Sequence, residues 1–148
     1  MGGSGRSGGT ERYNPRVDTA IEGTLVECCL THADIVAVYV FGSVAHGSSG
    51  PGSDVDVAVL FAKAPPHRLN SPRFELAGEL ERALGRPVDL IVLNDAPADL
   101  AVRILRTGIL VLDAQPSARI AFEVRTRNEA FDLEPMLAAY RAPREHAS

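Results

Sequence analysis

The stretch FGSVAHGSSGPGSDVDVAVL, residues 41–60, decides the fold of this 148-residue chain. It joins two segments rich in β-branched and aromatic residues, 34–41 and 54–61, through a connection rich in glycine, serine and proline. The flanking segments are typical of buried strands, and the small residues between them are typical of loops. The stretch therefore predicts two strands joined by a loop, with a short turn at 44–46.

Helical and strand patterns alternate on both sides of this stretch. Apolar residues recur at helical spacing over residues 16–32 before it. After it we expect a helix that ends at Gly85, a strand, a second helix, a short strand and a helical C-terminal segment, broken near 132–135 because proline fits only the first turn of a helix. The expected ranges after Gly85 are 88–93, 98–106, 109–113 and 117–140. The pattern predicts the α/β (α+β) class, with a small mixed β-sheet covered by helices.

The composition fits one small globular domain and excludes several classes of protein. Hydrophobic residues make up 45% of the chain and charged residues 23%. The net charge of −4 argues against a broad basic surface, so we expect no direct binding of nucleic acid. We also expect no membrane association, because no apolar segment is long enough to cross a bilayer. Adjacent cysteines, Cys28 and Cys29, suit neither a disulfide framework nor a zinc site, and so favour a cytoplasmic location.

The chain divides into one predicted domain with short flanking segments. Residues 1–14, rich in glycine and serine, predict a disordered leader or a tag remnant outside the fold. We expect the ordered domain to span 15–142 and residues 143–148 to form a flexible tail.

Three aspartates are the candidate catalytic and metal-binding residues. Asp54 and Asp56 stand two residues apart in a predicted strand, so their side chains point to the same face, about 7 Å apart. Paired carboxylates suit Mg²⁺, which prefers oxygen ligands and fills its shell with water and substrate phosphates. Asp89 stands second in its own predicted strand. If the two strands are neighbours, the three carboxylates meet at one end of the sheet, as in two-metal sites for in-line phosphoryl transfer.

Small residues next to these aspartates are the candidate nucleotide-binding residues. Gly42 allows a phosphate to approach the backbone, and the Ser43 hydroxyl adds a donor beside the N–H groups of the following turn. Ser53 immediately precedes the aspartate pair. Gly-Ser alone is more often a plain turn, but Gly-Ser followed by ten residues and Asp-x-Asp favours a functional site.

The same residues carry a resemblance to a known family. Residues 41–60 resemble the Gly-Ser, ten residues, Asp-x-Asp signature of minimal nucleotidyltransferases in the polymerase-beta-like superfamily. Residues 86–93, RPVDLIVL, are similar to the strand that bears the third aspartate of that family. Residues 98–108 and 131–135 resemble, more narrowly, MntA-type antitoxins of HEPN/MNT (type VII) toxin–antitoxin systems. The resemblance extends from Val17 to Tyr140 and implies the nucleotidyltransferase fold.

That resemblance implies an activity, a cofactor and a partner. It implies transfer of AMP from ATP to a tyrosine of a cognate HEPN ribonuclease toxin, with two Mg²⁺ ions, in a hetero-oligomer with that toxin. His46 stands where such proteins often carry arginine, so a fixed cation near the phosphates is in question. The residues carried over are Gly42 and Ser43 for the phosphates, Asp54 and Asp56 for Mg²⁺, and Asp89 as metal ligand or base.

Two other functions stay open at the level of sequence. One is a nucleotidyltransferase that modifies a small-molecule hydroxyl, as on an aminoglycoside, although the short chain leaves little room to enclose such an acceptor. The other is a non-catalytic module that neutralises a toxin by contact alone.

Overall fold

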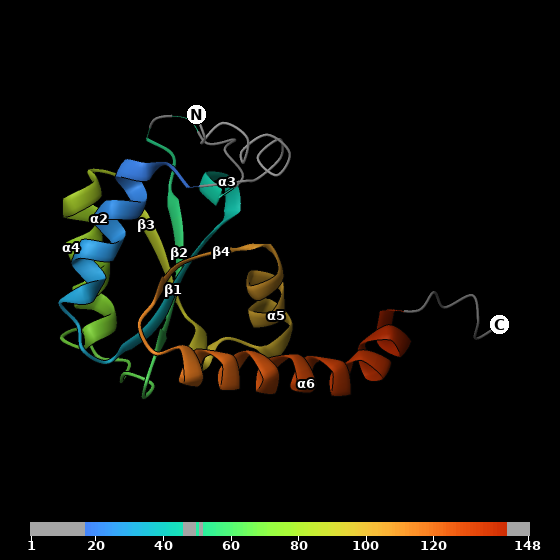
Figure 1. The fold of residues 1–148 in the computed structure, drawn as a ribbon. Coiled ribbons are helices and arrows are strands. Elements are labelled where there is room, and N and C mark those ends of the chain that lie inside the picture. The colour runs from blue at the N-terminus through green and yellow to red at the C-terminus, as the bar shows by residue number, and fades with distance from the viewer. Residues whose placement is uncertain (1–16, 46–49, 51, 142–148) are drawn as a thin grey trace, which may run out of the picture.

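The computed structural model of this chain describes residues 17–45, 50 and 52–141. The predicted leader, His46 and the predicted tail lie outside the described residues. The order of elements confirms the predicted alternation of helices and strands (Figure 1). In chain order they are α2 (Thr19–Leu30), β1 (Ile35–Phe41), α3 (Gly42–Ala45), β2 (Val55–Phe61), α4 (Pro72–Leu84), β3 (Val88–Val92), the 3-10 helix η1 (Leu93–Asp95), α5 (Ala98–Thr107), β4 (Ile109–Asp113) and α6 (Pro116–Arg141).

The four strands form one mixed sheet in the order β3-β2-β1-β4. β1 is antiparallel to both β2 and β4, whereas β2 and β3 are parallel. A parallel pair needs a crossover connection, and α4 supplies it. As a result, the end of β1, the start of β2 and the start of β3 all lie at the same end of the sheet.

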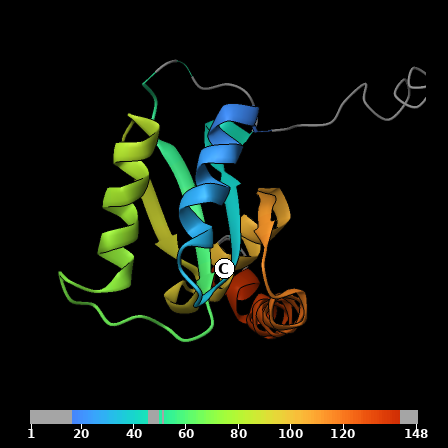
Figure 2. The ribbon, with the colours of Figure 1, turned by 60° about the vertical axis from the view of Figure 1, so that its left-hand side comes forward.

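Helices cover both faces of this sheet, as the two ribbon views show (Figures 1 and 2). Alternate side chains of β2 enter two separate cores: Val57 packs with α2 and α4, whereas Ala58 and Leu60 pack with α5 and α6. Asp56 is two residues from Ala58, so its side chain points to the face covered by α5 and α6. The candidate site therefore opens on that face.

The C-terminal segment differs from the expectation. α6 is one helix from Pro116 to Arg141, so the predicted break near 132–135 is wrong. A proline inside a helix removes one backbone hydrogen bond and can bend the axis without ending the helix. The ribbon of α6 changes direction near its C-terminal end (Figure 1).

The helix α4 ends at the glycine that the sequence predicts. Gly85 ends α4 in a left-handed conformation, with φ of 68°, and its N–H donates to the Glu81 carbonyl at 2.8 Å.

Both cysteines are free thiols in α2, with Cys29 fully buried and Cys28 partly buried. Over the residues described, no helix combines the length and the apolar character needed to cross a membrane.

Candidate active site

Asp56 and Asp89 stand side by side across the parallel pair of strands. The register of β2 and β3 aligns the two residues directly. Aligned residues of neighbouring strands point to the same face, and the strands are about 4.8 Å apart. Asp54 lies immediately before β2, two residues from Asp56. The structure therefore brings the three aspartates to one end of the sheet.

The electrostatics of the three carboxylates reflect this proximity. Partial burial raises the pKa of Asp56, and the neighbouring charges of Asp89 and Asp54 raise it further. Mutual repulsion of this kind is relieved by a cation.

The donor set fits a metal ion that needs few protein ligands. In the described part of the chain, no three Asp, Glu, His or Cys side chains lie close enough to hold a metal by themselves. Mg²⁺ commonly takes one or two carboxylates and completes its shell with water and substrate phosphates. The paired carboxylates of Asp56 and Asp89, with Asp54 beside them, suit that mode of binding.

Gly42 lies directly against Asp56. A Cβ atom at position 42 would stand 2.1 Å from Oδ2 of Asp56, and the φ angle of +75° also favours glycine. The sequence predicted that Gly42 makes room for a phosphate, and the structure adds that it makes room for the Asp56 carboxylate. Ser43 follows in the first turn of α3, whose Val44 and Ala45 are buried in the core beneath. Thus α3 fixes Gly42 and Ser43 beside the aspartates.

Arg86 is a residue of this region to which the sequence assigned no role. Its Nε donates to the carbonyl oxygen of Ser53 at 3.0 Å, and its Nη2 donates to that of Gly50 at 3.2 Å. The Ser53 hydroxyl, a predicted nucleotide ligand, accepts a hydrogen bond from the Gly50 N–H at 3.1 Å. Arg86 therefore ties the turn before Asp54 to the start of β3. The only signal in the sequence is an arginine three residues before Asp89, which does not identify its acceptors.

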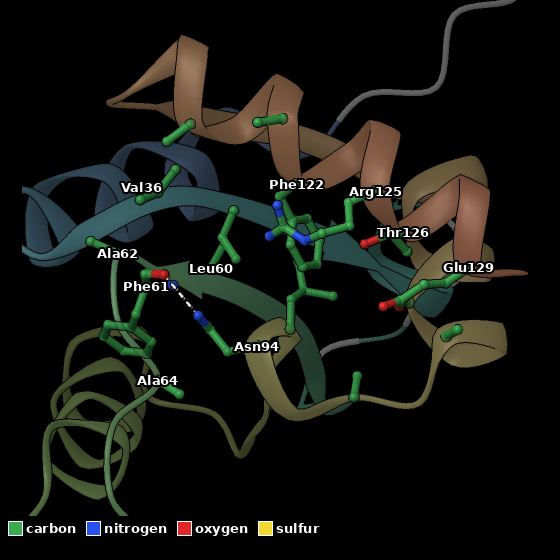
Figure 3. A pocket seen from close by; sticks show the side chains of 16 residues that line it. Val36, Leu60, Phe61, Ala62, Ala64, Asn94, Phe122, Arg125, Thr126 and Glu129 are labelled. Carbon is green, nitrogen blue, oxygen red and sulfur yellow. Dashed lines mark hydrogen bonds between the residues drawn. The ribbon is translucent and has the colours of Figure 1, made fainter.

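A cavity of about 440 Å³ lies at the opposite end of the strands, under α6 (Figure 3). Asn94 and Phe61 line it, and the Asn94 side-chain amide donates to the Phe61 carbonyl at 2.8 Å while its Oδ1 accepts from the Phe61 N–H at 2.9 Å. Phe61 ends β2, whereas the aspartates stand where β2 and β3 begin. The cavity is therefore separate from the carboxylate cluster.

Comparison with known proteins gives a relative of known activity. The protein adenylyltransferase MntA of Shewanella oneidensis is 35% identical over 89 residues, which make up 60% of this chain and 61% of MntA. The match thus spans less than two thirds of that relative.

Two solved structures share the fold over most of this chain. A chain of the crystal structure of a toxin-antitoxin with AMP-PNP has a TM-score of 0.64 and 28% identity, over 81% of this chain and 91% of that chain. A chain of the tri-AMPylated Shewanella oneidensis HEPN toxin in complex with the MNT antitoxin has a TM-score of 0.60 and 26% identity, over 82% of this chain and 89% of that chain.

The family model described as polymerase beta, nucleotidyltransferase matches residues 24–117. That range contains α3 and all four strands, and so every predicted site residue. On this match the chain belongs to the polymerase beta nucleotidyltransferase family.

Proposed function

We propose that this chain is an antitoxin that transfers AMP from ATP to a tyrosine of a cognate HEPN ribonuclease toxin and thereby neutralises it. The observation that carries the proposal is the alignment of Asp56 with Asp89 beside Gly42, at one end of the sheet. Family membership supports the class of reaction. Two relatives support a HEPN toxin as the acceptor of AMP. They are MntA, a protein adenylyltransferase, and the complex of an MNT antitoxin with a tri-AMPylated HEPN toxin.

Each site residue has a role in this reaction. Asp54 and Asp56 are the Mg²⁺ ligands, and Asp89 is a further ligand or the base that accepts the proton of the tyrosine hydroxyl. Mg²⁺, when bound, neutralises charge on the phosphates and on the attacking oxygen. Gly42, Ser43 and Ser53 border the phosphates of ATP.

The reaction is a displacement at the α-phosphorus of ATP. The tyrosine oxygen forms a bond to that phosphorus as the bond to the bridging oxygen of the β-phosphate breaks. Pyrophosphate leaves, and the phenolic proton passes to a carboxylate of the site. We place this reaction in the cytoplasm and within a single domain, residues 15–142.

The test incubates the purified chain with its cognate HEPN toxin, ATP and Mg²⁺. Mass spectrometry of the toxin should find AMP on tyrosine, and chelation of Mg²⁺ should prevent it. Asp56→Asn should abolish the transfer, whereas Asp99→Asn, a change at an exposed aspartate of α5, should leave it unchanged. Toxin that stays unmodified with the wild-type chain would exclude the proposed activity.

The same experiment separates the two other functions. AMP found on an added aminoglycoside but absent from the toxin would indicate a small-molecule acceptor. If the Asp56→Asn variant of this chain still inhibits the ribonuclease activity of the toxin, the chain neutralises the toxin by contact.

A further inference from the structure

A shallow groove lies between α5 and α6, apart from the carboxylate cluster. Its volume is about 420 Å³, and Val102 and Arg106 of α5 and Arg127, Ala130 and Phe131 of α6 line it. Both helices pack on the face of the sheet toward which Asp56 points. The groove and the candidate active site therefore belong to the same side of the molecule.

The α5 wall of the groove leads toward the active site. α5 ends at Gly108, where an added Cβ would stand 3.2 Å from the Val40 carbonyl oxygen and 3.6 Å from Cβ of Phe41. Those residues end β1, and Gly42 follows them directly. A partner held along α5, near Arg106, thus lies beside the end of the sheet that carries the aspartates.

Large apolar side chains are exposed along α6, and one of them, Phe131, lines this groove. Ile120 is 50% exposed, Val124 52% and Phe131 75%. They are four and seven residues apart, so they form one stripe along the helix. A row of exposed apolar side chains marks a surface that a partner covers.

The charge of the groove restricts what that partner can be. Arg106 and Arg127 line it, and none of its described lining residues is acidic, although the chain as a whole carries a net charge of −4. Arg127 lies 3.6 Å from Glu123 of the same helix, which is outside the lining. A second copy in a two-fold dimer would bring these arginines against the same arginines, which is unfavourable. A complementary partner presents apolar side chains flanked by carboxylates.

We propose that this groove, formed by Val102, Arg106, Arg127, Ala130 and Phe131, is the docking surface for the acceptor protein. It takes a segment of the HEPN toxin in which an apolar side chain stands between aspartates or glutamates. This inference rests on the proposed function and specifies where its partner binds.

The test measures the dissociation constant between the toxin and variants of this chain. Phe131→Asp and Arg106→Glu should each weaken binding by about tenfold or more, because aromatic and arginine side chains dominate interface energies. Arg106→Lys, which keeps the charge, should retain most of the affinity. In AMP transfer, the two disruptive variants should raise the KM for toxin and leave kcat and the affinity for ATP unchanged.

Matched controls replace the same residue types elsewhere on the surface. Leu69→Asp changes an apolar side chain that is 87% exposed in the connection before α4, and Arg82→Glu reverses an exposed charge on α4, on the opposite face of the sheet. Both should bind toxin within about twofold of the wild type. Circular dichroism and thermal melting of every variant check that the fold is intact.

The outcomes separate this inference from the proposed function. Wild-type affinity in both groove variants would refute the docking surface and leave the transferase activity standing. If the wild type binds the toxin without transferring AMP, the proposed activity is refuted. The affinities of the variants then still test whether the groove is the docking surface. A wild-type chain that binds no toxin, or a dimer of this chain that Phe131→Asp dissociates, would also overturn the docking proposal.

Discussion

The Asp56 carboxylate lies next to the backbone of Gly42, in space that a Cβ atom at position 42 would fill. The Cβ of Gly42→Ala would meet Oδ2 of Asp56 at 2.1 Å, and alanine also disfavours the φ of +75°. We expect this variant to lose about 1–3 kcal/mol of stability. We also expect its AMP transfer to fall by at least about tenfold, because the carboxylate is displaced. Thermal melting and the toxin-labelling assay measure the two effects.

Gly23 in α2 provides the matched control for that substitution. No atom lies within 4 Å of a Cβ built at Gly23, and the residue is inside a helix. Gly23→Ala should therefore keep full activity and gain up to about 1 kcal/mol of stability. Equal activity in the two alanine variants would show that Gly42 does not position Asp56.

Arg86 holds the turn before Asp54 in place through two hydrogen bonds. Arg86→Ala removes two charge-assisted hydrogen bonds, to the carbonyl oxygens of Ser53 and Gly50, and so loosens the turn before Asp54. Such bonds contribute about 1.5–3 kcal/mol each, so we expect at least a tenfold loss of AMP transfer. Amide hydrogen exchange of residues 52–55 should become faster. Arg82→Ala, at an exposed position of α4, should change neither measurement, and unchanged exchange in Arg86→Ala would contradict the positioning role.

The sequence predicts which way the aspartates point, but it does not predict the contacts of Gly42 and Arg86. Alternation along a strand is a local property, so the shared face of Asp54 and Asp56 follows from their spacing. The contact between Gly42 and Asp56 depends on the pairing of β1 with β2, which aligns Phe41 with Asp56. The acceptors of Arg86 lie 33 and 36 residues away in the chain, so no local pattern specifies them.

A cluster of polar side chains fixes α6 to the sheet. The Tyr39 hydroxyl of β1 donates to Glu123 at 2.7 Å, and Arg119 donates to both carboxylate oxygens of Asp113, the last residue of β4, at 2.9 Å each. Arg119 also donates to Glu123 at 3.2 Å. These contacts hold the helix that bears one wall of the docking groove.

We expect Arg119→Ala to destabilise the fold by about 2–4 kcal/mol, because it leaves the partly buried carboxylates of Asp113 and Glu123 without their cation. For a chain of this size each kcal/mol lowers Tm by about 2–4 °C. Differential scanning calorimetry provides the measurement. Arg125→Ala is the control, since this exposed arginine lies 5.9 Å from the ring centre of Phe122 and should contribute at most about 1 kcal/mol. Equal Tm values for the two variants would contradict the anchoring role.

Hydrophobic periodicity predicts the strands and helices of this chain well, including the helical segment over 117–140, and fails only at the break expected inside α6. The expected strand 109–113 coincides with β4, and Gly85 and Gly108 mark the ends of α4 and α5 as expected. Polar contacts through Tyr39, Asp113 and Arg119 hold α6 to the sheet, and contacts of this kind are not visible in a pattern of apolar residues. Pro135 then suggests an end to the helix where the structure has none.

The order of the strands in the sheet creates the candidate active site. Sequence patterns identify β2 and β3 and the aspartate of each, but they do not specify that the two strands are parallel neighbours. The crossover through α4 determines that relation, because it returns the chain to the same end of the sheet before β3 begins. The candidate metal ligands thus come from residues that are 33 positions apart in sequence and directly aligned in space.

A site assembled from two strands should make nucleotide binding and folding interdependent. ATP with Mg²⁺ at about 100 times its dissociation constant stabilises the native state by about 2.7 kcal/mol, which corresponds to a rise in Tm of about 5–10 °C. We expect ATP without Mg²⁺ to produce a much smaller rise. Asp56→Asn and Asp89→Asn should each lose the Mg²⁺-dependent part although they lie on different strands, and Asp99→Asn should retain it. Both site variants should stay folded without ligand, because each removes one charge from a repelling group. A full thermal shift in Asp89→Asn, with none in Asp56→Asn, would mean that β3 takes no part in the site and that the parallel pairing of the two strands serves the fold alone.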